Sequence, residues 1–399
     1  MKTKLIHRRD WIHSLACGAA TLTAASYLRA AGANERLRAA VIGRTGRGDY
    51  GHSLDIVWRN VPEVDLLAVA DDDPKGLANA ANRLKVKRAF ADYREMLDKV
   101  RPHVVSIAPR WLDKHYEMAM ACAERGIHMY LEKPFVRTLA EADELIATCE
   151  RTNTKLAIAC QSHYSPKIAV AKELIAKGNI GAVLEYRARG KEDHRGGAED
   201  LWVLGTHVLD LIRYFGGDPK SCLATLTENG ELVTKANVRE GNEGLGPLAG
   251  DAVLASYSMT DDSAAFFASR REMGRGDNRF GLQIFGSMGI IEVMPNYMGS
   301  VKYLPDPAWS PGRSNKTWLE VTSAGIDRPE PIKKIGNSEG NRIAALDLIA
   351  AVREDRQPLC GMYDGRGTLE MIHAAFESHR LQHRVTMPLV NRQHPLTML

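Results

Sequence analysis

The glycine-rich segment Val41–Gly48 follows directly on the first short β-rich run of the chain. Glycines in such a turn permit a tight bend and let backbone N–H groups approach a pyrophosphate at a helix N-terminus. The spacing departs from the G-x-G-x-x-G pattern, because Thr45 replaces the second glycine when reading starts at Gly43, whereas a reading from Gly46 fits. The pattern predicts a dinucleotide-binding loop that contains Gly43, Thr45, Gly46, Arg47 and Gly48.

An acidic residue, Asp71, closes the second β-rich run, 28 residues after Gly43. A carboxylate at this place can accept hydrogen bonds from both hydroxyls of an adenosine ribose, and it would repel a 2′-phosphate. Asp71 therefore predicts NAD rather than NADP as the cofactor. The next residues, Asp72 and Asp73, precede Pro74 and are interpreted as a helix-capping turn.

A third group of polar side chains, Glu132-Lys133-Pro134, follows the fourth β-rich run. Doubly wound sheets bind their ligands at the carboxyl ends of the strands, where this group would lie. Pro134 restricts the backbone of Lys133 to an extended conformation. A lysine held there can donate a hydrogen bond to a substrate hydroxyl and stabilise the alkoxide that forms as hydride leaves.

Short apolar runs alternate with helical patterns in the part of the chain that must position these groups. The β-rich runs are Leu37–Ile42, Asp65–Ala70, Val104–Ala108, His128–Leu131 and Lys155–Ala159. Between them lie helical patterns, and Thr138 with Glu141 forms a capping box for the helix Ala140–Arg151. Strands that alternate with helices indicate a parallel sheet with crossover helices. We therefore predict a doubly wound Rossmann domain over residues 34–160.

The pattern changes after about residue 160. Helices are predicted over Ile168–Lys177, about Leu201–Phe215, Asn341–Glu354 and Thr368–His379, and strands over Val253–Met259, Ala264–Arg270, Arg279–Phe285 and Gly289–Val293. Residues 229–250 and 305–316 are predicted to be long loops, because they are rich in Gly and Asn or in Pro and Ser. Alternating segments of this kind are typical of antiparallel sheets. Residues 161–399 therefore predict an α/β domain of the α+β type with a mainly antiparallel, open sheet.

The motifs described above, together with Gly205–Asp210 and Phe285–Gly289, resemble those of the Gfo/Idh/MocA family, the relatives of glucose–fructose oxidoreductase and inositol dehydrogenase. The resemblance extends over nearly all of the chain after residue 36. It implies an N-terminal Rossmann domain, a C-terminal α/β domain, a bound nicotinamide nucleotide and a sugar-like or cyclitol substrate. It also implies a homo-oligomer, because the open face of the sheet commonly pairs in this family.

The resemblance assigns expected roles to individual residues. Lys133 would lie beside the nicotinamide and the substrate, and His207 would be the general base that removes the hydroxyl proton. Pro109, His115 and Glu132 match family positions near the cofactor. A core histidine on an amphipathic helix is the alternative interpretation of His207.

One position departs from the family pattern. Many dehydrogenases of the family carry an aspartate four residues before the histidine, and Val203 occupies that position here. Asp200, Val203 and His207 share one face if the helix already includes Asp200. Asp200 is therefore predicted to act one turn earlier as the third catalytic residue, with Glu199 and His194 as further candidates in the same polar stretch.

The first 33 residues have the pattern of an export signal. A basic stretch ends in Arg8 and Arg9, a weakly hydrophobic run extends to Leu28, and Ala31-Gly32-Ala33 supplies a cleavage site. The arginine pair resembles a twin-arginine signal, whose machinery carries folded proteins, and predicts a periplasmic location. An uncleaved membrane anchor is the alternative.

The charge and the cysteines exclude several other classes of protein. Residues 1–33 hold five basic residues and one acidic residue, which leaves 48 of each in the rest of the chain. A neutral body without a basic stripe indicates no nucleic-acid partner. Five widely spaced cysteines remain after cleavage, with no C-x-x-C pair, so they indicate buried packing rather than a zinc site or a disulfide framework.

These features predict an exported, NAD-binding oxidoreductase that acts on a carbohydrate or cyclitol hydroxyl by hydride transfer. Because no pool of NAD is expected outside the cytoplasm, the cofactor must be carried through export and bound tightly. Two alternatives remain open. One is an NAD-dependent, redox-neutral lyase or glycosidase of the same fold, and the other is a non-catalytic carbohydrate-binding protein with a degenerate site.

Overall fold

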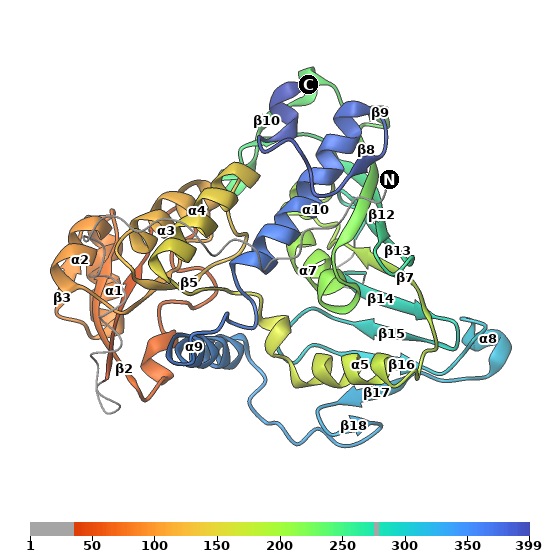
Figure 1. Cartoon of the computed structure of the whole chain (residues 1–399), viewed down its shortest axis with the longest axis horizontal. Helices are drawn as coiled ribbons and strands as arrows, with labels where there is room; N and C mark the ends of the chain where they lie inside the picture. The colour runs from red at the N-terminus through yellow and green to blue at the C-terminus, as the bar shows by residue number, and fades with distance from the viewer. Residues whose placement is uncertain (1–35, 275–278) are drawn as a thin grey trace, which may run out of the picture.

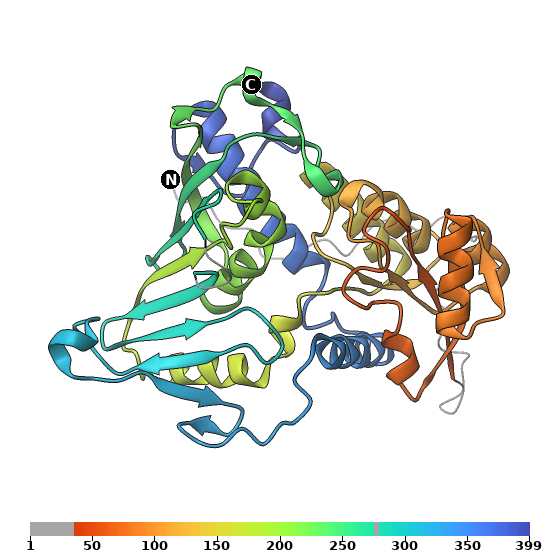
Figure 2. The ribbon, with the colours of Figure 1, turned by 180° about the vertical axis from the view of Figure 1, so that it is seen from behind.

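The structure is a computed structural model that describes residues 36–274 and 279–399. The predicted export signal, residues 1–33, lies outside the described residues. Among the helices within these two ranges, none has the apolar length that crossing a bilayer requires. Two sheets, each with helices packed against it, account for most of the described chain (Figure 1, Figure 2).

The N-terminal sheet has six parallel strands in the order β3-β2-β1-β4-β5-β6. Its strands are β1 Leu37–Ile42, β2 Val64–Ala70, β3 Arg88–Phe90, β4 Val104–Ile107, β5 His128–Leu131 and β6 Leu156–Ile158. Strands β4 and β5 are buried at every residue, which is why they are largely apolar runs in the sequence. This strand order is that of a doubly wound, nucleotide-binding sheet, and it confirms the predicted Rossmann topology.

Three of the four helices of this half begin where the sequence supplies a capping side chain, and the third along the chain does not. The four helices are α1 Pro74–Leu84, α2 Tyr93–Val100, α3 His115–Ala123 and α4 Leu139–Thr152. The Asp73 carboxylate accepts a hydrogen bond from the Gly76 amide at 2.6 Å, and Pro74 occupies the first turn of α1. Thr138 and Glu141 form the predicted capping box of α4.

The glycine-rich segment after β1 does not lead into an α-helix, which corrects the predicted helix N-terminus. Turns occupy residues 51–55, and a short 3-10 helix, η1 Val57–Asn60, follows them. Residues with positive φ interrupt the segment at Gly46, Gly48, Asp49, Gly51 and Ser53. An α-helix of L-residues does not accommodate this left-handed backbone, so the helix cannot start here.

The C-terminal sheet is open and mixed, in the order β18-β17-β16-β15-β14-β7-β13-β12-β8-β19, with β9 paired to β8. Its strands are β7 Val183–Arg189, β8 Pro219–Glu228, β9 Glu231–Leu232, β12 Ala252–Met259, β13 Ala264–Arg270, β14 Gly281–Gly286, β15 Gly289–Val293, β16 Val301–Leu304, β17 Leu319–Thr322, β18 Gly325–Ile326 and β19 Val385–Thr386. All neighbours are antiparallel except β7 and β13. The predicted fold class is confirmed.

Helices α7 and α10 cover the face of this sheet that is turned towards the N-terminal half (Figure 1). The helices of this half are α5 Pro166–Ala176, α6 Ala198–Val203, α7 Gly205–Gly216, α8 Pro311–Ser314, α9 Asn337–Arg353 and α10 Met362–Leu381. Helix α9 returns to the N-terminal half and packs against η1, β5 and β6. There the Tyr130 hydroxyl donates to Asn341 Oδ1 at 2.8 Å. The carboxyl ends of the parallel strands therefore lie at an interface between the two halves.

Candidate active site

Lys133 lies just beyond the carboxyl end of β5, between the two halves of the molecule. Its side chain is buried, and Nζ donates a hydrogen bond to the backbone carbonyl of Val203 at 3.3 Å. Burial lowers the pKa of the Lys133 ammonium, although the carboxylates of Glu132 and Glu243 act in the opposite direction. A lysine of this kind exchanges a proton more readily near neutral pH than an exposed lysine does.

Helices α6 and α7 meet at Leu204, so the single helix predicted over about Leu201–Phe215 is wrong. The amide of His207 donates to the carbonyl of Leu204, three residues earlier, at 3.0 Å. This tighter turn leaves the carbonyl of Val203 for the Lys133 ammonium. A backbone carbonyl therefore meets the lysine at the position where the family pattern has an aspartate side chain.

His207 lies in the first turn of α7, with a partly buried side chain. Burial lowers its pKa well below the usual value, and the positive charges of Lys133 and His52 lower it further. The imidazole is therefore neutral at neutral pH, and a neutral imidazole has one nitrogen that can accept a proton. The structure thus brings Lys133 and His207 into one site, and their catalytic roles stay predictions.

Asp200 lies in α6, and its carboxylate supports the segment that follows β7. Its Oδ2 accepts hydrogen bonds from the Ser269 hydroxyl at 2.6 Å and from the Glu192 amide at 3.0 Å. Within the described part of the chain, none of the hydrogen bonds of Asp200 goes to His207. The shared helical face that the spacing predicted is absent, because the break at Leu204 puts the two residues in different helices. The geometry makes Asp200 a support of residues 190–197 rather than a partner of the histidine.

The carboxylate of Asp71 ends β2 as expected but is used inside the protein. It accepts hydrogen bonds from the Thr45 amide at 3.0 Å, the Thr45 hydroxyl at 2.7 Å and the Tyr50 hydroxyl at 2.7 Å. Only 2% of Asp71 is exposed, whereas the side chain of Asp72 is 63% exposed. Asp71 is therefore an internal support of the glycine-rich loop, and Asp72 is the carboxylate that faces solvent at the same strand end.

The glycine-rich loop is a closed turn rather than an open cradle of amides. Arg44 and Asp49 pair through their backbones, with hydrogen bonds of 3.0 and 3.1 Å. The amides of Thr45 and Gly46 donate to the carboxylates of Asp71 and Asp49. The predicted approach of these amides to a pyrophosphate is therefore corrected, because the loop uses them for its own hydrogen bonds.

Two arginines supply positive charge to this loop instead. Arg44 Nη1 lies 2.7 Å from Asp113, and the guanidinium of Arg47 lies 4.6 Å from the ring centre of Trp111. The loop also packs closely on the segment after β4, since a Cβ at Gly48 would lie 2.6 Å from the Trp111 amide nitrogen. Gly48, at φ 86°, is therefore required for this packing.

A cleft of about 340 Å³ opens at the carboxyl ends of β1, β2 and β3. Its lining includes Gly43, Arg44, Asp71, Asp72, Tyr93, Arg94, Lys114 and Met118. Carboxylates suit ribose hydroxyls, cations suit phosphates, and an apolar side chain such as that of Met118 suits a base. The residues present therefore fit the adenosine end of a nicotinamide nucleotide.

Three other residues expected to bind the cofactor support the surrounding loops from within. His115 is buried, with Nε2 2.7 Å from the carbonyl of Pro109 and Nδ1 2.8 Å from that of Pro134. Glu132 is also buried and accepts a hydrogen bond from the His52 amide at 3.0 Å. Burial alone would raise the pKa of Glu132, but the hydrogen bonds and the charge of His52 lower it overall. These contacts tie the ends of β1, β4 and β5 together.

The predicted loop over residues 229–250 carries further polar side chains to the site. Its tip is the 3-10 helix η5, Asn242–Gly244. The carboxylate of Glu243 raises the pKa of Lys133, against the effect of burial. Its Oε1 lies 3.1 Å from Arg110 Nε. Asn242 Nδ2 donates to Glu199 at 2.9 Å. The sequence did not indicate Glu243, because the composition of a loop does not show which distant part of the chain its tip will contact.

Glu199 and His194, the further candidates, occupy different environments. Burial and the negative charge of Glu243 raise the pKa of Glu199, against the effect of its hydrogen bond with Asn242. His194 has a side chain that is 78% exposed, beside Asp193. Of the two, Glu199 is the one that contacts the tip of the 229–250 loop, through Asn242, the neighbour of Glu243.

A buried ion pair fixes the helix that carries His207. His163, in the 3-10 helix η3 Gln161–Tyr164, places Nε2 2.7 Å from Asp210 of α7. Burial alone would lower the pKa of His163, but Asp210 raises it overall. The pair thus holds α7 against the end of the parallel sheet.

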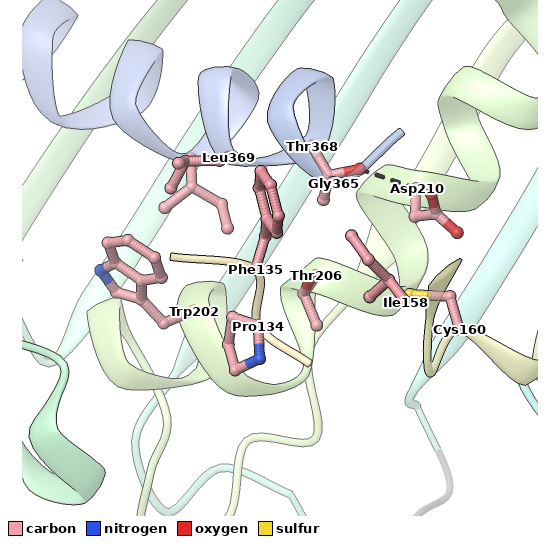
Figure 3. Close-up of a pocket in the computed structure, with 11 residues that line it drawn as sticks. Pro134, Phe135, Ile158, Cys160, Trp202, Thr206, Asp210, Gly365, Thr368 and Leu369 are labelled. Atoms are coloured by element: carbon pink, nitrogen blue, oxygen red, sulfur yellow. Dashed lines mark hydrogen bonds between the residues drawn. The ribbon is translucent and has the colours of Figure 1, made fainter. Parts of the chain in front are cut away.

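A small cavity lies between α7 and α10, and Figure 3 shows its lining, which includes Pro134, Phe135, Trp202, Thr206 and Cys160. Ligand atoms of Cys160, Asp210 and Cys360 lie within 4.8 Å of one another there. The hydrogen bond with Cys160 and burial raise the pKa of the Cys360 thiol, which keeps it protonated. The five cysteines in the described ranges are free and buried, which confirms the packing role expected for them.

A doubly wound sheet, an open mixed sheet, and a lysine and a neutral histidine between them define a nicotinamide-nucleotide-dependent oxidoreductase. The sequence matches the profiles of the Gfo/Idh/MocA oxidoreductases, as the NAD-binding Rossmann fold at residues 37–160 and the C-terminal α/β domain at residues 172–387. The chain belongs to this family.

Several relatives have named activities. Levoglucosan dehydrogenase of Pseudarthrobacter phenanthrenivorans is 25% identical over 81% of this chain and 90% of its own length. Myo-inositol 2-dehydrogenase of Thermotoga maritima is 24% identical over 63% of this chain and 74% of its own length. The structure of levoglucosan dehydrogenase in complex with NADH and levoglucosan superposes with a TM-score of 0.71 at 23% identity, covering 89% of this chain and all of that one. The relatives support an NAD(P)-dependent oxidoreductase that acts on carbohydrates.

Proposed function

We propose that this family member works outside the cytoplasm, with NAD held tightly, on one hydroxyl of a carbohydrate or cyclitol. The observation that carries the proposal is that Lys133, just beyond the carboxyl end of β5, and a neutral His207 lie in one site, where the charge of Lys133 acts on the imidazole. The named substrates of the relatives, levoglucosan and myo-inositol, support the class of substrate.

Lys133 and His207 act on the same substrate oxygen. The neutral imidazole of His207 takes the hydroxyl proton, and the Lys133 ammonium donates a hydrogen bond to the oxygen as negative charge develops on it. The Val203 carbonyl fixes the ammonium before the substrate arrives, which reduces the ordering required on binding. A nicotinamide nucleotide, when bound, supplies the hydride acceptor or donor for this chemistry.

The proposed location rests on residues 1–33 and on the pair Arg8-Arg9 within them. A twin-arginine route admits folded protein, so the cofactor can travel inside the chain that binds it. Retention through export and dilution requires a Kd near 1 nM, which is about 12 kcal/mol of binding free energy. The redox state of a retained cofactor must then be restored on the enzyme, by a second substrate or by redox-neutral chemistry.

The exposed face of the C-terminal sheet supports a homo-oligomer. Large apolar side chains on three neighbouring strands, β8, β12 and β13, face solvent there, and they are Leu223, Leu254 and Phe266. Contiguous apolar surface of this kind commonly marks a protein–protein interface. We propose that a second copy of the chain covers it.

A redox-neutral lyase or glycosidase reaction is the second candidate, and Glu199 favours it. A carboxyl group with a raised pKa stays protonated to higher pH and can protonate a leaving oxygen. In such a reaction a transient ketone acidifies the neighbouring C–H bond, and the cofactor ends in its starting state.

The experiment starts from mature protein purified from the periplasm and dialysed. The content of nicotinamide nucleotide is measured first, and sugars, cyclitols and glycosides are then added while the absorbance of the bound nucleotide is followed. A lasting change in redox state supports the dehydrogenase reaction, whereas glycoside cleavage without such a change supports the second candidate. Folded protein that binds sugar but no dinucleotide would make it a non-catalytic carbohydrate-binding protein, and protein that needs added, exchanging NAD would contradict retention.

A further inference from the structure

We propose that Glu243 is a positioning residue of the cofactor site, because it holds the segment after β4 against the glycine-rich loop and so slows release of the bound nucleotide. It belongs to a hairpin, residues 239–248, that consists of β10 Arg239–Glu240, the tip η5 and β11 Pro247–Leu248. This inference rests on the proposed function, because it concerns how long the cofactor stays bound. In both ribbon views the hairpin extends from the C-terminal half towards the N-terminal half (Figure 1, Figure 2).

The base of the hairpin is fixed to the C-terminal half. Glu228, at the end of β8, accepts a hydrogen bond from the Gly250 amide at 2.9 Å and pairs with Arg239 at 3.1 Å. Leu245 and Leu248 are buried. Because its base is anchored in this way, the hairpin holds its tip in a fixed position.

The tip reaches the N-terminal half through an ion pair and a close backbone contact. Glu243 Oε1 lies 3.1 Å from Arg110 Nε, and η5 packs against η2, Leu112–Lys114. A Cβ at Gly244, where φ is 69°, would lie 2.7 Å from Asp113 Cβ. Glu243 itself has φ 53°, a conformation that a non-glycine residue keeps only where its surroundings impose it.

The same segment, residues 110–113, touches the glycine-rich loop on its other side. The Arg110 amide donates to the Gly48 carbonyl at 3.3 Å, and Asp113 binds Arg44 at 2.7 Å. The segment is therefore held between the loop that faces the cleft and the hairpin tip. Because Arg44 and Lys114 line the cleft, a nucleotide bound there leaves more easily when this segment moves away.

The test measures the dissociation rate of bound NADH by its fluorescence after a chase with excess NAD, in the mature protein. Glu243→Gln and Arg110→Gln should each accelerate release about two- to fivefold, the range expected for a partly exposed ion pair. The double variant should add little to either change, because both single variants remove the same pair. Gly244→Ala should accelerate release as well, since its Cβ pushes the tip away from Asp113.

Lys220→Gln is the matched control, because Lys220 pairs with Asp262 at 2.6 Å within the C-terminal half and takes no part in the hairpin or its anchor. It should leave the dissociation rate unchanged. The positioning role also predicts that Glu243→Gln changes the rate of NADH release more than the KM for the sugar. Equal release rates in the unchanged protein, Glu243→Gln and Arg110→Gln would overturn the inference while leaving the proposed function intact. Protein that binds no NADH at all would contradict the proposed function instead.

Discussion

The Nζ of Lys133 lies 3.3 Å from the backbone oxygen of Val203, and this contact joins the end of strand β5 to the end of helix α6. A carbonyl cannot take up a proton near neutral pH, so it orients the ammonium without compensating its charge. Burial lowers the pKa of the neighbouring His207 most, and the positive charge of Lys133 lowers it further, which helps to keep the imidazole neutral. The site therefore contains a lysine and a histidine but lacks the aspartate of the family pattern.

The acid limb of the pH profile should lie below the ordinary pKa of histidine. Burial and the charges of Lys133 and His52 lower the pKa of His207 from 6.5, so the base stays deprotonated into mildly acidic solution. Lys133→Met removes one of these charges and should move the pKa of His207 upwards. The titration of the His207 ring signals by NMR, in both proteins, measures this shift. An unchanged or lower pKa in Lys133→Met would refute the electrostatic coupling.

Cofactor choice should depend on Asp72 more than on Asp71. The Asp71 carboxylate is occupied by Thr45 and Tyr50, whereas Asp72 is exposed at the cleft, where it would repel a 2′-phosphate. Asp72→Ala should narrow the ratio of the Kd values for NADP and NAD, measured by calorimetry, by about tenfold or more.

The companion variant Asp71→Asn tests the internal role of that residue. It should weaken the binding of both NAD and NADP, because it disturbs the glycine-rich loop. The ratio of the two Kd values should stay nearly unchanged. If the ratio of the Kd values changed in Asp71→Asn but not in Asp72→Ala, Asp71 would be the residue that contacts the ribose.

Asp200→Asn should cost stability more than chemistry. Its carboxylate accepts hydrogen bonds from the Ser269 hydroxyl and from the backbone amides of Lys191 and Glu192, and the amide side chain of asparagine replaces these acceptors imperfectly. We expect a loss of about 1–3 kcal/mol in the free energy of unfolding, measured with denaturant. The pH dependence of kcat/KM should not shift. A displaced acid limb would instead show that Asp200 acts on His207.

Acid should destabilise the fold through two buried histidines near Trp202. Burial lowers the pKa of His373 to about 4 and that of His394 to about 3, whereas both titrate near 6.5 when unfolded. Their stabilising contribution is complete above pH 6.5, declines below it as the unfolded chain takes up protons, and is lost once the pH has fallen through the folded values. Each can remove up to about 1.4 kcal/mol per pH unit in that window.

The variant His373→Gln keeps a donor for the Arg137 carbonyl but cannot titrate. Its Tm should therefore fall less steeply than that of the unchanged protein between about pH 6.5 and about pH 4.5. Identical slopes would show that other groups dominate the acid transition.

The sequence predicted the elements whose signals are local. Burial and capping act within a few residues, so the sequence shows the apolar runs of β1, β4 and β5 and the capping box of α4. Strand β3 was missed, since three residues at the edge of a sheet carry little pattern. The break at Leu204 was missed for another reason: it leaves the Val203 carbonyl for Lys133, 70 residues earlier, and helical spacing cannot show such a contact.

The site was predictable to a similar extent. Lys133 was identified from its place at a strand end, where position follows from topology, and His207 from the resemblance to the family. The inward turn of the Asp71 carboxylate depends on Tyr50, 21 residues away, and the reach of Glu243 depends on how a long loop folds back. Tertiary contacts decide both, so residue type and spacing were insufficient.

The redox state of the bound cofactor reports directly on the proposed roles of Lys133 and His207. Mature protein is mixed with a panel of sugars and cyclitols, and the absorbance of its reduced nicotinamide is recorded for the unchanged protein, Lys133→Met and His207→Ala, with circular dichroism as the folding control. A carbohydrate or cyclitol should change the redox state of the cofactor in the unchanged protein, and each variant should retain the nucleotide but react at least about a hundredfold more slowly. Variants that react at the unchanged rate, or a cofactor that no sugar or cyclitol oxidises or reduces, would contradict the proposed function.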